Sequence, residues 1–494
     1  MKKHPILCLI LASVLTLSLL PSAARGADIP ETTAETEPQT TNAPAVSTGG
    51  GDTSVSGGSH SLDAQVPLGG TSEKPKSARS ALLYERKTDT LLYAYDPDRK
   101  SYPASLVKVM TGLLAVESGN LDRQVTVTEE ALSGVASNSL SVDLKAGETL
   151  TMRDLLYCMM MESANDACAV IAVEVAGSRD AFVEQMNRRA AALGCTGTQF
   201  VNVDGMEDPQ QYTTARDMAR ILNAALDNEE FVSAFGAMTY TIPATSQSEE
   251  RVLESSNYLM TQAIGGIYLH DDRVTGGKSG AISNEDRSLV CTATDGSLDL
   301  ICVIMSAVGQ TDTDGFSLKY LGNYEEAETL LDHGFSRFSV REIISAGQSL
   351  VQIPVTNGAN AVAGGSAASV STVLPTETKA AELRWSYTVP DSLTAPVSAG
   401  ASLGSAQVWL GSTCVAQTEI LAMNGAAVDD RTLTASAESS AEPAALPKGL
   451  RTVLLVILAA AVLFMLGLVA LRQIRLMQIR ARRRRRRENR RRSR

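Results

Sequence analysis

The chain has 494 residues, which is too long for a single hydrophobic core, so we expect two or three domains. The formal net charge is −11, although thirteen arginines and one glutamate lie within residues 472–494. Subtracting that tail's +12 leaves −23 on residues 1–471. So strongly acidic a surface excludes nucleic acid as the partner of the main part of the chain.

The N-terminus has the features of a secretory signal peptide. Lys2 and Lys3 precede an apolar run, and small residues at 21–24 suit cleavage by signal peptidase. We therefore assign residues 1–26 to the signal. Residues 27–77 are rich in Thr, Ser, Gly, Pro and Glu and have too few apolar side chains for a core, so we predict a disordered tether there.

Folded structure is expected from residue 78. Strands are predicted at 81–84 and 91–95, and a helix should begin at Pro103, because proline suits a first turn and apolar residues follow at helical spacing. Ser105 and Lys108 lie three residues apart on it, so their side chains can touch. A lysine can take the serine's proton if burial and nearby cations lower its pKa. Alone, this pair is a weak signal.

A second polar motif interrupts the helices that follow. Helices are predicted from Thr151, where Asp154 completes a capping pair, and at 166–176, 180–193 and 214–226. Ser163 and Asn165 lie at the break before the second of these helices. Taken alone, a polar pair at such a break is explained by helix capping.

A third motif, Lys278-Ser279-Gly280-Ala281, lies in a glycine-rich strand. Glycine weakens a strand unless something must approach the backbone closely, and a substrate bound along the strand edge would do so. Strands at 289–293 and 298–307 and a helix at 325–333 are predicted next. In residues 339–430 the helix signals stop, which predicts a small antiparallel β domain.

The C-terminal region predicts a membrane anchor. Residues 452–471 are apolar and uncharged, long enough to cross a bilayer, and follow a linker at 431–450. We assign the transmembrane helix to 451–471. The arginines of 472–494 predict a cytoplasmic tail, so the protein should be single-pass in the cell membrane with its folded domains outside the cytoplasm.

The cysteines and histidines indicate neither a disulfide framework nor a metal site. Six cysteines remain after loss of Cys8 with the signal, and they form no Cys-x-x-Cys pair. Cys291 and Cys302 flank a predicted hairpin turn at 295–297 and could face each other. No cluster has zinc-ligand spacing, so no metal and no other cofactor is expected.

The three motifs, in this order, resemble the motif set of penicillin-binding proteins and class A β-lactamases. From about residue 78 to 338 the chain is similar to the low-molecular-mass penicillin-binding proteins, the serine-type D-alanyl-D-alanine carboxypeptidases. Residues 339–430 resemble the β-rich domain that follows in that family. The resemblance implies an α+β fold with a β-lactamase/transpeptidase-like catalytic domain, in which helices cover both sides of an antiparallel sheet, then a small all-β domain and a C-terminal transmembrane helix.

The resemblance also implies catalytic roles. Ser105 would attack the carbonyl between two D-alanines, and Lys108 would accept its proton. Ser163 would relay the proton to the leaving amine, and Asn165 would hold the lysine and the substrate amide. The implied substrates are peptidoglycan stem peptides that end in D-Ala-D-Ala, with β-lactam antibiotics as covalent inhibitors.

The third motif would bind the substrate. Lys278 and Ser279 suit its terminal carboxylate, and the backbone N–H groups of Ser105 and Ala281, beside Gly280, suit the oxyanion. The chain departs from the family at some positions: Val107 and Ser279 stand where threonine is usual, Asp204 where histidine is usual, and Thr213 where serine is usual.

Several alternatives remain open. A Ser-His-Asp hydrolase would need one of His60, His270 or His333, and no Gly-x-Ser-x-Gly elbow is present. A β-lactamase would need a base for deacylation; Glu207, Asp208 and Glu285 are carboxylates in plausible regions, but none lies in a recognisable deacylation loop. A D,D-endopeptidase of the same fold and an inactive wall-binding scaffold also fit parts of the pattern.

Overall fold

The computed structural model describes residues 61–261, 269–283, 286–311 and 318–429, together with residues 463, 465, 466, 468 and 472. The chain divides at Gly51 into two units, and all of the described residues belong to the second. Within the described ranges, no helix combines the length and apolar character needed to cross a membrane. The predicted anchor at 451–471 lies almost entirely outside them.

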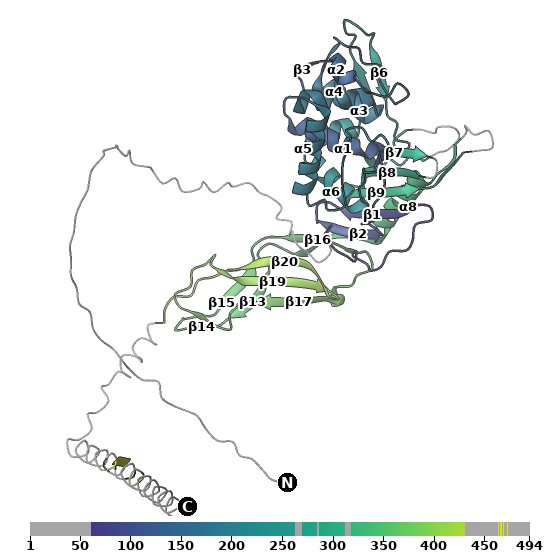
Figure 1. Cartoon of the computed structure of the whole chain (residues 1–494). Helices are drawn as coiled ribbons and strands as arrows, with labels where there is room; N and C mark the ends of the chain where they lie inside the picture. The colour runs from purple at the N-terminus through teal and green to yellow at the C-terminus, as the bar shows by residue number, and fades with distance from the viewer. Residues whose placement is uncertain are drawn as a thin grey trace, which may run out of the picture. The chain divides into compact units, whose positions relative to one another are not determined.

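The first domain is built on a five-stranded antiparallel sheet in the order β2-β1-β9-β8-β7 (Figure 1). Its strands are β1 (Ser80–Glu85), β2 (Thr90–Tyr95), β7 (Val274–Ser283), β8 (Asp286–Thr294) and β9 (Asp299–Ala307). Neighbours β1 and β9 come from opposite ends of the domain's sequence, so the sheet closes the domain. Strand β7 lies at an edge, where one side of its backbone is not paired within the sheet.

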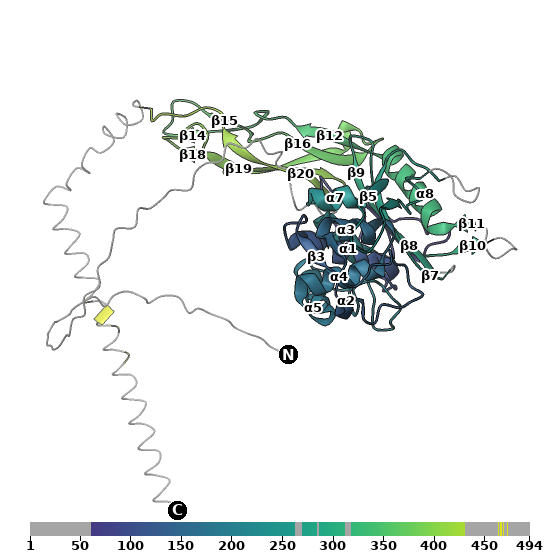
Figure 2. The ribbon, with the colours of Figure 1, turned by 90° about the horizontal axis from the view of Figure 1, so that it is seen from above.

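Helices cover both faces of this sheet, as the fold class predicts. Helix α8 (Gly322–Arg337) contacts β8 and β9 on one face, and α6 (Ala215–Ala225) contacts β1 and β9 on the other. Figure 2 shows the sheet between α8 and the main cluster of helices. That cluster contains α1 (Val107–Glu117), α2 (Glu129–Leu132), α3 (Met152–Met161), α4 (Asn165–Ala176), α5 (Arg179–Ala192) and α7 (Glu229–Phe235).

Three two-stranded antiparallel ladders lie outside the central sheet in the described part of the domain. They pair β3 (Gln124–Thr126) with β4 (Thr149–Thr151), β5 (Thr239–Ile242) with β6 (Arg251–Glu254), and β10 (Gly309–Thr311) with β11 (Leu318–Leu321). The sequence patterns did not predict these strands or α7, because each is too short to show a clear hydrophobic period.

Local signals determine where the helices begin and end. Thr151 and Asp154 form the predicted capping box at the start of α3. Gly177, with a φ of 80°, ends α4 in the left-handed conformation that glycine tolerates. By contrast, ten consecutive residues of α1, from Val107 to Val116, are buried, so this helix runs through the core. It therefore presents the Ser-x-x-Lys motif from a rigid element.

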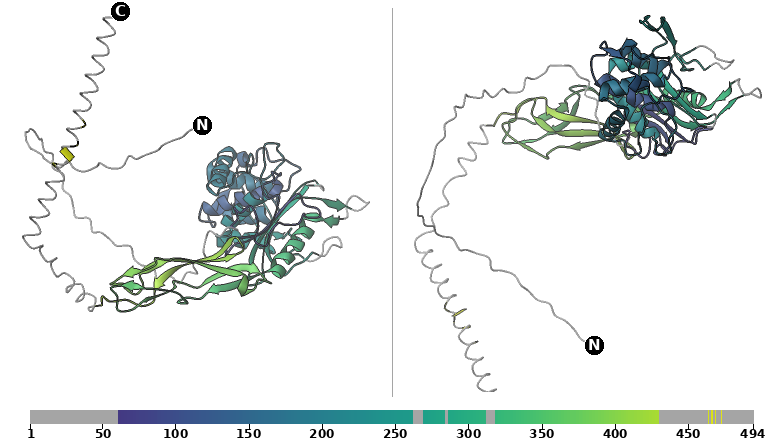
Figure 3. Two further views of the ribbon diagram at one scale, coloured as in Figure 1. Left: turned by 90° about the horizontal axis from the view of Figure 1, so that it is seen from below. Right: turned by 45° about the horizontal axis from the view of Figure 1, so that its top comes forward.

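The second domain confirms the predicted antiparallel β architecture. A five-stranded sheet has the order β13-β15-β20-β19-β17, and β12 pairs with β16. Figure 3 shows β19 and β20, coloured yellow-green, running side by side. Only the short β14 and β18 pair in parallel among the described strands. The bounds are β12 (Phe338–Ile344), β13 (Ser349–Ile353), β14 (Val355–Thr356), β15 (Val362–Ser366), β16 (Val370–Pro375), β17 (Leu383–Thr388), β18 (Leu393–Thr394), β19 (Ser402–Leu410) and β20 (Thr413–Ala422).

The structure differs from the predicted tether over residues 61–77, which pack on the first domain. Leu68 is 2% exposed, and its N–H donates to the Leu91 carbonyl over 2.8 Å. The buried guanidinium of Arg216 donates to the carbonyls of Leu62 and Ala64. Leu62 and Leu68 stand in a stretch that is otherwise polar, so the composition did not indicate that the segment packs on the domain. In the structure these two leucines and the hydrogen bonds from Arg216 hold it there.

The cysteine pair lies as the predicted hairpin implies. Cys291 on β8 and Cys302 on β9 are directly opposite each other, and both are buried free thiols. Burial raises the pKa of Cys302 well above its ordinary value, so this thiol is protonated near neutral pH and is a poor nucleophile.

Candidate active site

The first two motifs meet at the oxygen of Ser105. Ser105 lies in a 3-10 turn (Ala104–Leu106) that opens α1, and Lys108 Nζ donates to its Oγ over 3.3 Å. The Ser163 hydroxyl, 58 residues further along the chain, donates to the same Oγ over 3.0 Å. The structure therefore brings together three of the predicted site residues around one nucleophilic atom.

Two residues of this site hold unusual backbone conformations. Ala104 has a φ of 46° and Ser163 a φ of 56°, in the left-handed region that side chains other than glycine rarely occupy. Each such residue costs about 1–2 kcal/mol, so the surrounding packing must hold it in place. Backbone strain of this kind is concentrated at functional sites, where it aims a reactive side chain.

The two lysines of the motifs are both buried. Lys108 is 0% exposed, and burial lowers its pKa from the ordinary value. Lys278 on β7 is 2% exposed; burial, followed by repulsion from Lys108, lowers its pKa to about 7. Because the two charges repel each other, the site favours a state in which one amine is neutral. A neutral Lys108 can accept the proton of Ser105.

A tight turn at residues 202–206 orients Lys108. The amine donates to the Asp204 carbonyl, and Thr111, one turn along α1, donates to the Val203 carbonyl over 2.6 Å. A neutral amine that donates one N–H to Asp204 keeps its lone pair available for the Ser105 hydroxyl. The sequence patterns did not identify this turn, because its contacts with α1 span more than ninety residues.

Two glycines let other segments approach the nucleophile's backbone. A Cβ on Gly205, which has a φ of 89°, would lie 1.9 Å from the Ala104 carbonyl oxygen. A Cβ on Gly280 would lie 2.9 Å from the Ser105 nitrogen. The sequence predicted that a substrate would approach this strand closely; at Gly280 the segment that does so is the protein's own turn at Ala104–Leu106. This approach brings the edge of β7, with Ala281 next in sequence, against the N–H of Ser105, where an oxyanion would need donors.

The side chains of Lys278 and Ser279, the other residues of the third motif, point to opposite sides of β7. Lys278 interacts with Lys108, and its Nζ also donates to the Ser279 carbonyl over 3.2 Å. The Ser279 side chain forms a hydrogen bond with Tyr324 of α8, a buried hydroxyl whose pKa burial raises to about 12. Tyr324 was not predicted as a site residue, and no motif marks it.

Asn165 begins α4 and joins the site to a loop that the motifs did not reveal. Its N–H donates to the Leu140 carbonyl over 2.7 Å. The carboxylate of the next residue, Asp166, accepts from the Ser141 hydroxyl over 2.6 Å and the Leu144 N–H over 3.0 Å. Leu140 itself is 61% exposed, so this loop presents one apolar side chain to solvent near the second motif.

Two of the groups that the alternative chemistries would need, His270 and Asp208, make contacts away from Ser105. His270 contacts the Met260 carbonyl and Asp272. Asp208 accepts from the Gln210 N–H over 2.8 Å, and Glu207 is exposed. Glu285 and His60 lie outside the described residues. Within the part of the chain that the structure describes, no group of three His, Cys, Asp or Glu side chains could hold a metal ion.

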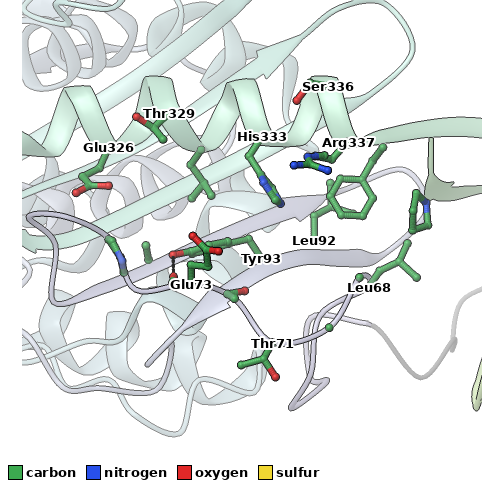
Figure 4. A pocket seen from close by; sticks show the side chains of 18 of the residues that line it. Leu68, Thr71, Glu73, Leu92, Tyr93, Glu326, Thr329, His333, Ser336 and Arg337 are labelled. Carbon is green, nitrogen blue, oxygen red and sulfur yellow. Dashed lines mark hydrogen bonds between the residues drawn. The ribbon is translucent and has the colours of Figure 1, made fainter. Parts of the chain in front are cut away.

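A separate cavity of about 580 Å³ lies between α8, β2 and the segment 68–76 (Figure 4). His333 points into it beside Tyr93, with ring centroids 6.0 Å apart. None of the predicted site residues lines this cavity, and its lining carries glutamates as well as basic side chains. It is therefore distinct from the serine–lysine site, which opens at the β7 edge of the sheet.

Comparison with known proteins agrees with this architecture. The family profile for D-alanyl-D-alanine carboxypeptidase matches residues 69–309, and the profile for the C-terminal domain of penicillin-binding protein 5 matches residues 338–426. The chain is 30% identical over 365 residues to D-alanyl-D-alanine carboxypeptidase DacC of Escherichia coli strain K12, covering 72% of this chain and 85% of that protein.

Further relatives extend the comparison. The chain is 28% identical over 296 residues to D-alanyl-D-alanine carboxypeptidase DacF of Bacillus subtilis strain 168, covering 58% of this chain and 70% of that protein. Penicillin binding protein 5 from Haemophilus influenzae has a crystal structure that matches with a TM-score of 0.56 at 26% identity, covering 72% of this chain and all of that one.

Proposed function

The chain belongs to the D-alanyl-D-alanine carboxypeptidase family, and we propose that it removes the terminal D-alanine from peptidoglycan stem pentapeptides through an acyl-enzyme on Ser105. One observation carries this proposal: the Ser105 hydroxyl is contacted at once by Lys108 and Ser163. β-Lactam antibiotics, which resemble the D-Ala-D-Ala end, would acylate the same oxygen and remain there as inhibitors.

Acylation begins when neutral Lys108 takes the proton of Ser105 and the oxygen attacks the carbonyl between the two D-alanines. The negative charge that develops on the carbonyl oxygen is placed next to the N–H groups of Ser105 and Ala281. Ser163 passes the proton to the leaving amine, which departs as free D-alanine. Water then attacks the ester, again with Lys108 as the base, and releases the shortened peptide.

Substrate selection follows from the third motif. Lys278, on the edge strand itself, can attract the terminal carboxylate when its amine is charged, whereas the Ser279 side chain lies on the opposite side of the strand, with Tyr324. Because β7 is an edge strand, the peptide can align along it as an additional strand. The Asn165 side chain, at the start of α4, would hold the substrate amide, as the motif set of the family implies.

We further propose that the protein is exported and held in the cell membrane by residues 451–471, with the arginine tail in the cytoplasm. The apolar run and the asymmetric distribution of arginines support this orientation. Substrate in the wall lies on the same side of the membrane as the site in that arrangement.

The proposal is tested by mass spectrometry of the products from a muropeptide that ends in a pentapeptide, with a cross-linked dimer as a second substrate. Loss of one alanine from the pentapeptide supports a carboxypeptidase, whereas separation of dimers without loss of alanine supports the D,D-endopeptidase. The variant Ser105→Ala should lose both hydrolysis and labelling by fluorescent penicillin. Ser118→Ala, at the far end of α1, should keep both.

A further inference from the structure

The turn that holds Lys108 also carries a carboxylate. Asp204 offers its main-chain carbonyl to the lysine, while its side-chain Oδ1 accepts from the Met206 N–H over 3.1 Å. Asn202 braces the turn, since its side chain accepts from the Gly205 N–H and donates to the Met206 carbonyl, each over 2.8 Å. The carboxylate is therefore fixed to a rigid turn that touches the catalytic base.

The groups that face Lys108 come from four elements. Ser105, in the 3-10 turn, is neutral, and Lys278 on β7 is a second amine whose positive charge repels that of Lys108. Cys168 on α4 is a neutral thiol near pH 7, because burial raises its pKa to about 12. Within the described residues, Asp204 is thus the one residue with a carboxylate side chain among those that interact with Lys108.

We propose that Asp204 is a positioning residue whose carboxylate, acting through Lys108, sets the acid side of the pH range in which Ser105 is acylated. The inference rests on the proposed function only in that Lys108 is the base. This role of the Asp204 carboxylate differs from that of the main-chain carbonyl, which any residue at position 204 would supply.

The sign of the effect follows from electrostatics. Lys108 must be neutral to accept a proton, and a neighbouring carboxylate stabilises the charged ammonium form. Asp204 therefore opposes the burial and the Lys278 charge that favour the neutral amine. As the pH is lowered, the protein that contains Asp204 should therefore lose activity at a higher pH than a variant that lacks this carboxylate.

The test measures the second-order rate constant for acylation of the full chain by a fluorescent penicillin as a function of pH. Asp204→Asn removes the charge and keeps an oxygen that can accept from Met206, and Asp204→Glu keeps the charge. Asp208→Asn is a matched control, because Asp208 makes the same kind of side-chain contact, to the N–H two residues on, in the same loop.

We expect Asp204→Asn to move the acid limb to lower pH, so that acylation on that limb is several-fold faster than in the unmodified protein, while the profile above about pH 7, where Lys278 loses its charge, is unchanged. Asp204→Glu and Asp208→Asn should follow the unmodified profile. An Asn variant whose acid limb stays in place or moves to higher pH would overturn the proposal.

Two further outcomes are decisive. If Asp204→Asn fails to fold, Asp204→Ser supplies a hydroxyl acceptor for Met206, and its acid limb is judged by the same criterion. If the acid limb moves as expected but no alanine is released from pentapeptide, the inference about Asp204 stands while the proposed carboxypeptidase activity fails.

Discussion

At the scale of single residues, the site depends on two buried lysines that have opposite tasks. Lys108 must be neutral to act as a base, and Lys278 must be charged to attract a carboxylate. Burial alone penalises the charge on both. A substrate carboxylate beside Lys278 would restore the charge on that lysine, and the resulting repulsion would favour the neutral form of Lys108. Binding of the correct substrate would in this way help to prepare the base.

Lys108→Arg should preserve the fold and abolish acylation. Arginine keeps a positive charge but cannot give up its proton near neutral pH, so it cannot serve as the base. We expect the rate constant for penicillin acylation to fall by about 10²–10⁴-fold, the usual contribution of a general base. Circular dichroism should show unchanged secondary structure. A variant that acylates normally would mean that another group removes the proton.

The charge of Lys278 predicts a pH-dependent preference for carboxylate substrates. With a pKa lowered to about 7, Lys278 is charged below that pH and neutral above it in the free enzyme. The KM for a peptide with a free C-terminal carboxylate should therefore rise as the pH increases above about 7. A peptide with a C-terminal carboxamide should show no such rise, and equal pH profiles for the two would refute the assigned role.

At the scale of elements, three segments converge on the 3-10 turn that precedes α1. The helix itself is held by the core, β7 approaches from the sheet edge, and the turn at 202–206 packs behind Ala104. Neither β7 nor the turn could come so close with a side chain at the contact. The glycines at 205 and 280 therefore have a steric role that their φ angles alone do not explain.

Gly205→Ala should disrupt the nucleophile through this contact. The added Cβ would collide with the Ala104 carbonyl, and the left-handed conformation by itself costs about 1–2 kcal/mol. Gly194→Ala is the matched control, because Gly194 also has a positive φ, 76°, but a Cβ added there would meet no other atom within 4 Å.

Thermal unfolding and penicillin acylation together separate the two effects. The Gly194 variant should lose only the stability that the left-handed conformation of alanine costs, and it should be acylated at the normal rate. The Gly205 variant should be less stable than the Gly194 variant and should also acylate slowly. Equal behaviour of the two would show that the contact with Ala104 does not position Ser105.

At the scale of the whole molecule, the folded part outside the proposed membrane anchor consists of two domains joined without a long linker. Helix α8 ends at Arg337 and β12 begins at Phe338, whose ring packs in the same hydrophobic cluster as residues of the central sheet. The linker predicted at 431–450 would follow the second domain. Its flexible coil would reach only about 25 Å on average, so the β domain would act as a spacer between membrane and site.

Truncation after residue 444 should release a soluble enzyme that still cleaves small peptides, because every motif lies before residue 282. On intact cells it should trim the wall less efficiently than the anchored protein. Protease added outside cells should digest the region 78–430 of the full chain and spare the arginine tail. Cleavage of the tail with protection of the domains would show that the proposed orientation is wrong.

The sequence alone determined the order of the motifs, the family resemblance, most helix bounds in the first domain and the β character of the second. These features depend on hydrophobic periods, caps and turns that extend over a few residues. The capping box at Thr151 and the glycine that ends α4 are examples, since each acts within one turn of helix.

Only the tertiary structure decided the electrostatics and fine geometry of the site. The base Lys108 contacts a turn 96 residues away, and Ser105 meets Ser163 across 58 residues. Ser279 meets Tyr324, and residues 61–77 dock on Arg216. Burial, charge coupling and steric contact depend on distances through space, and no period or spacing along a single chain reports which distant segments will pack against each other.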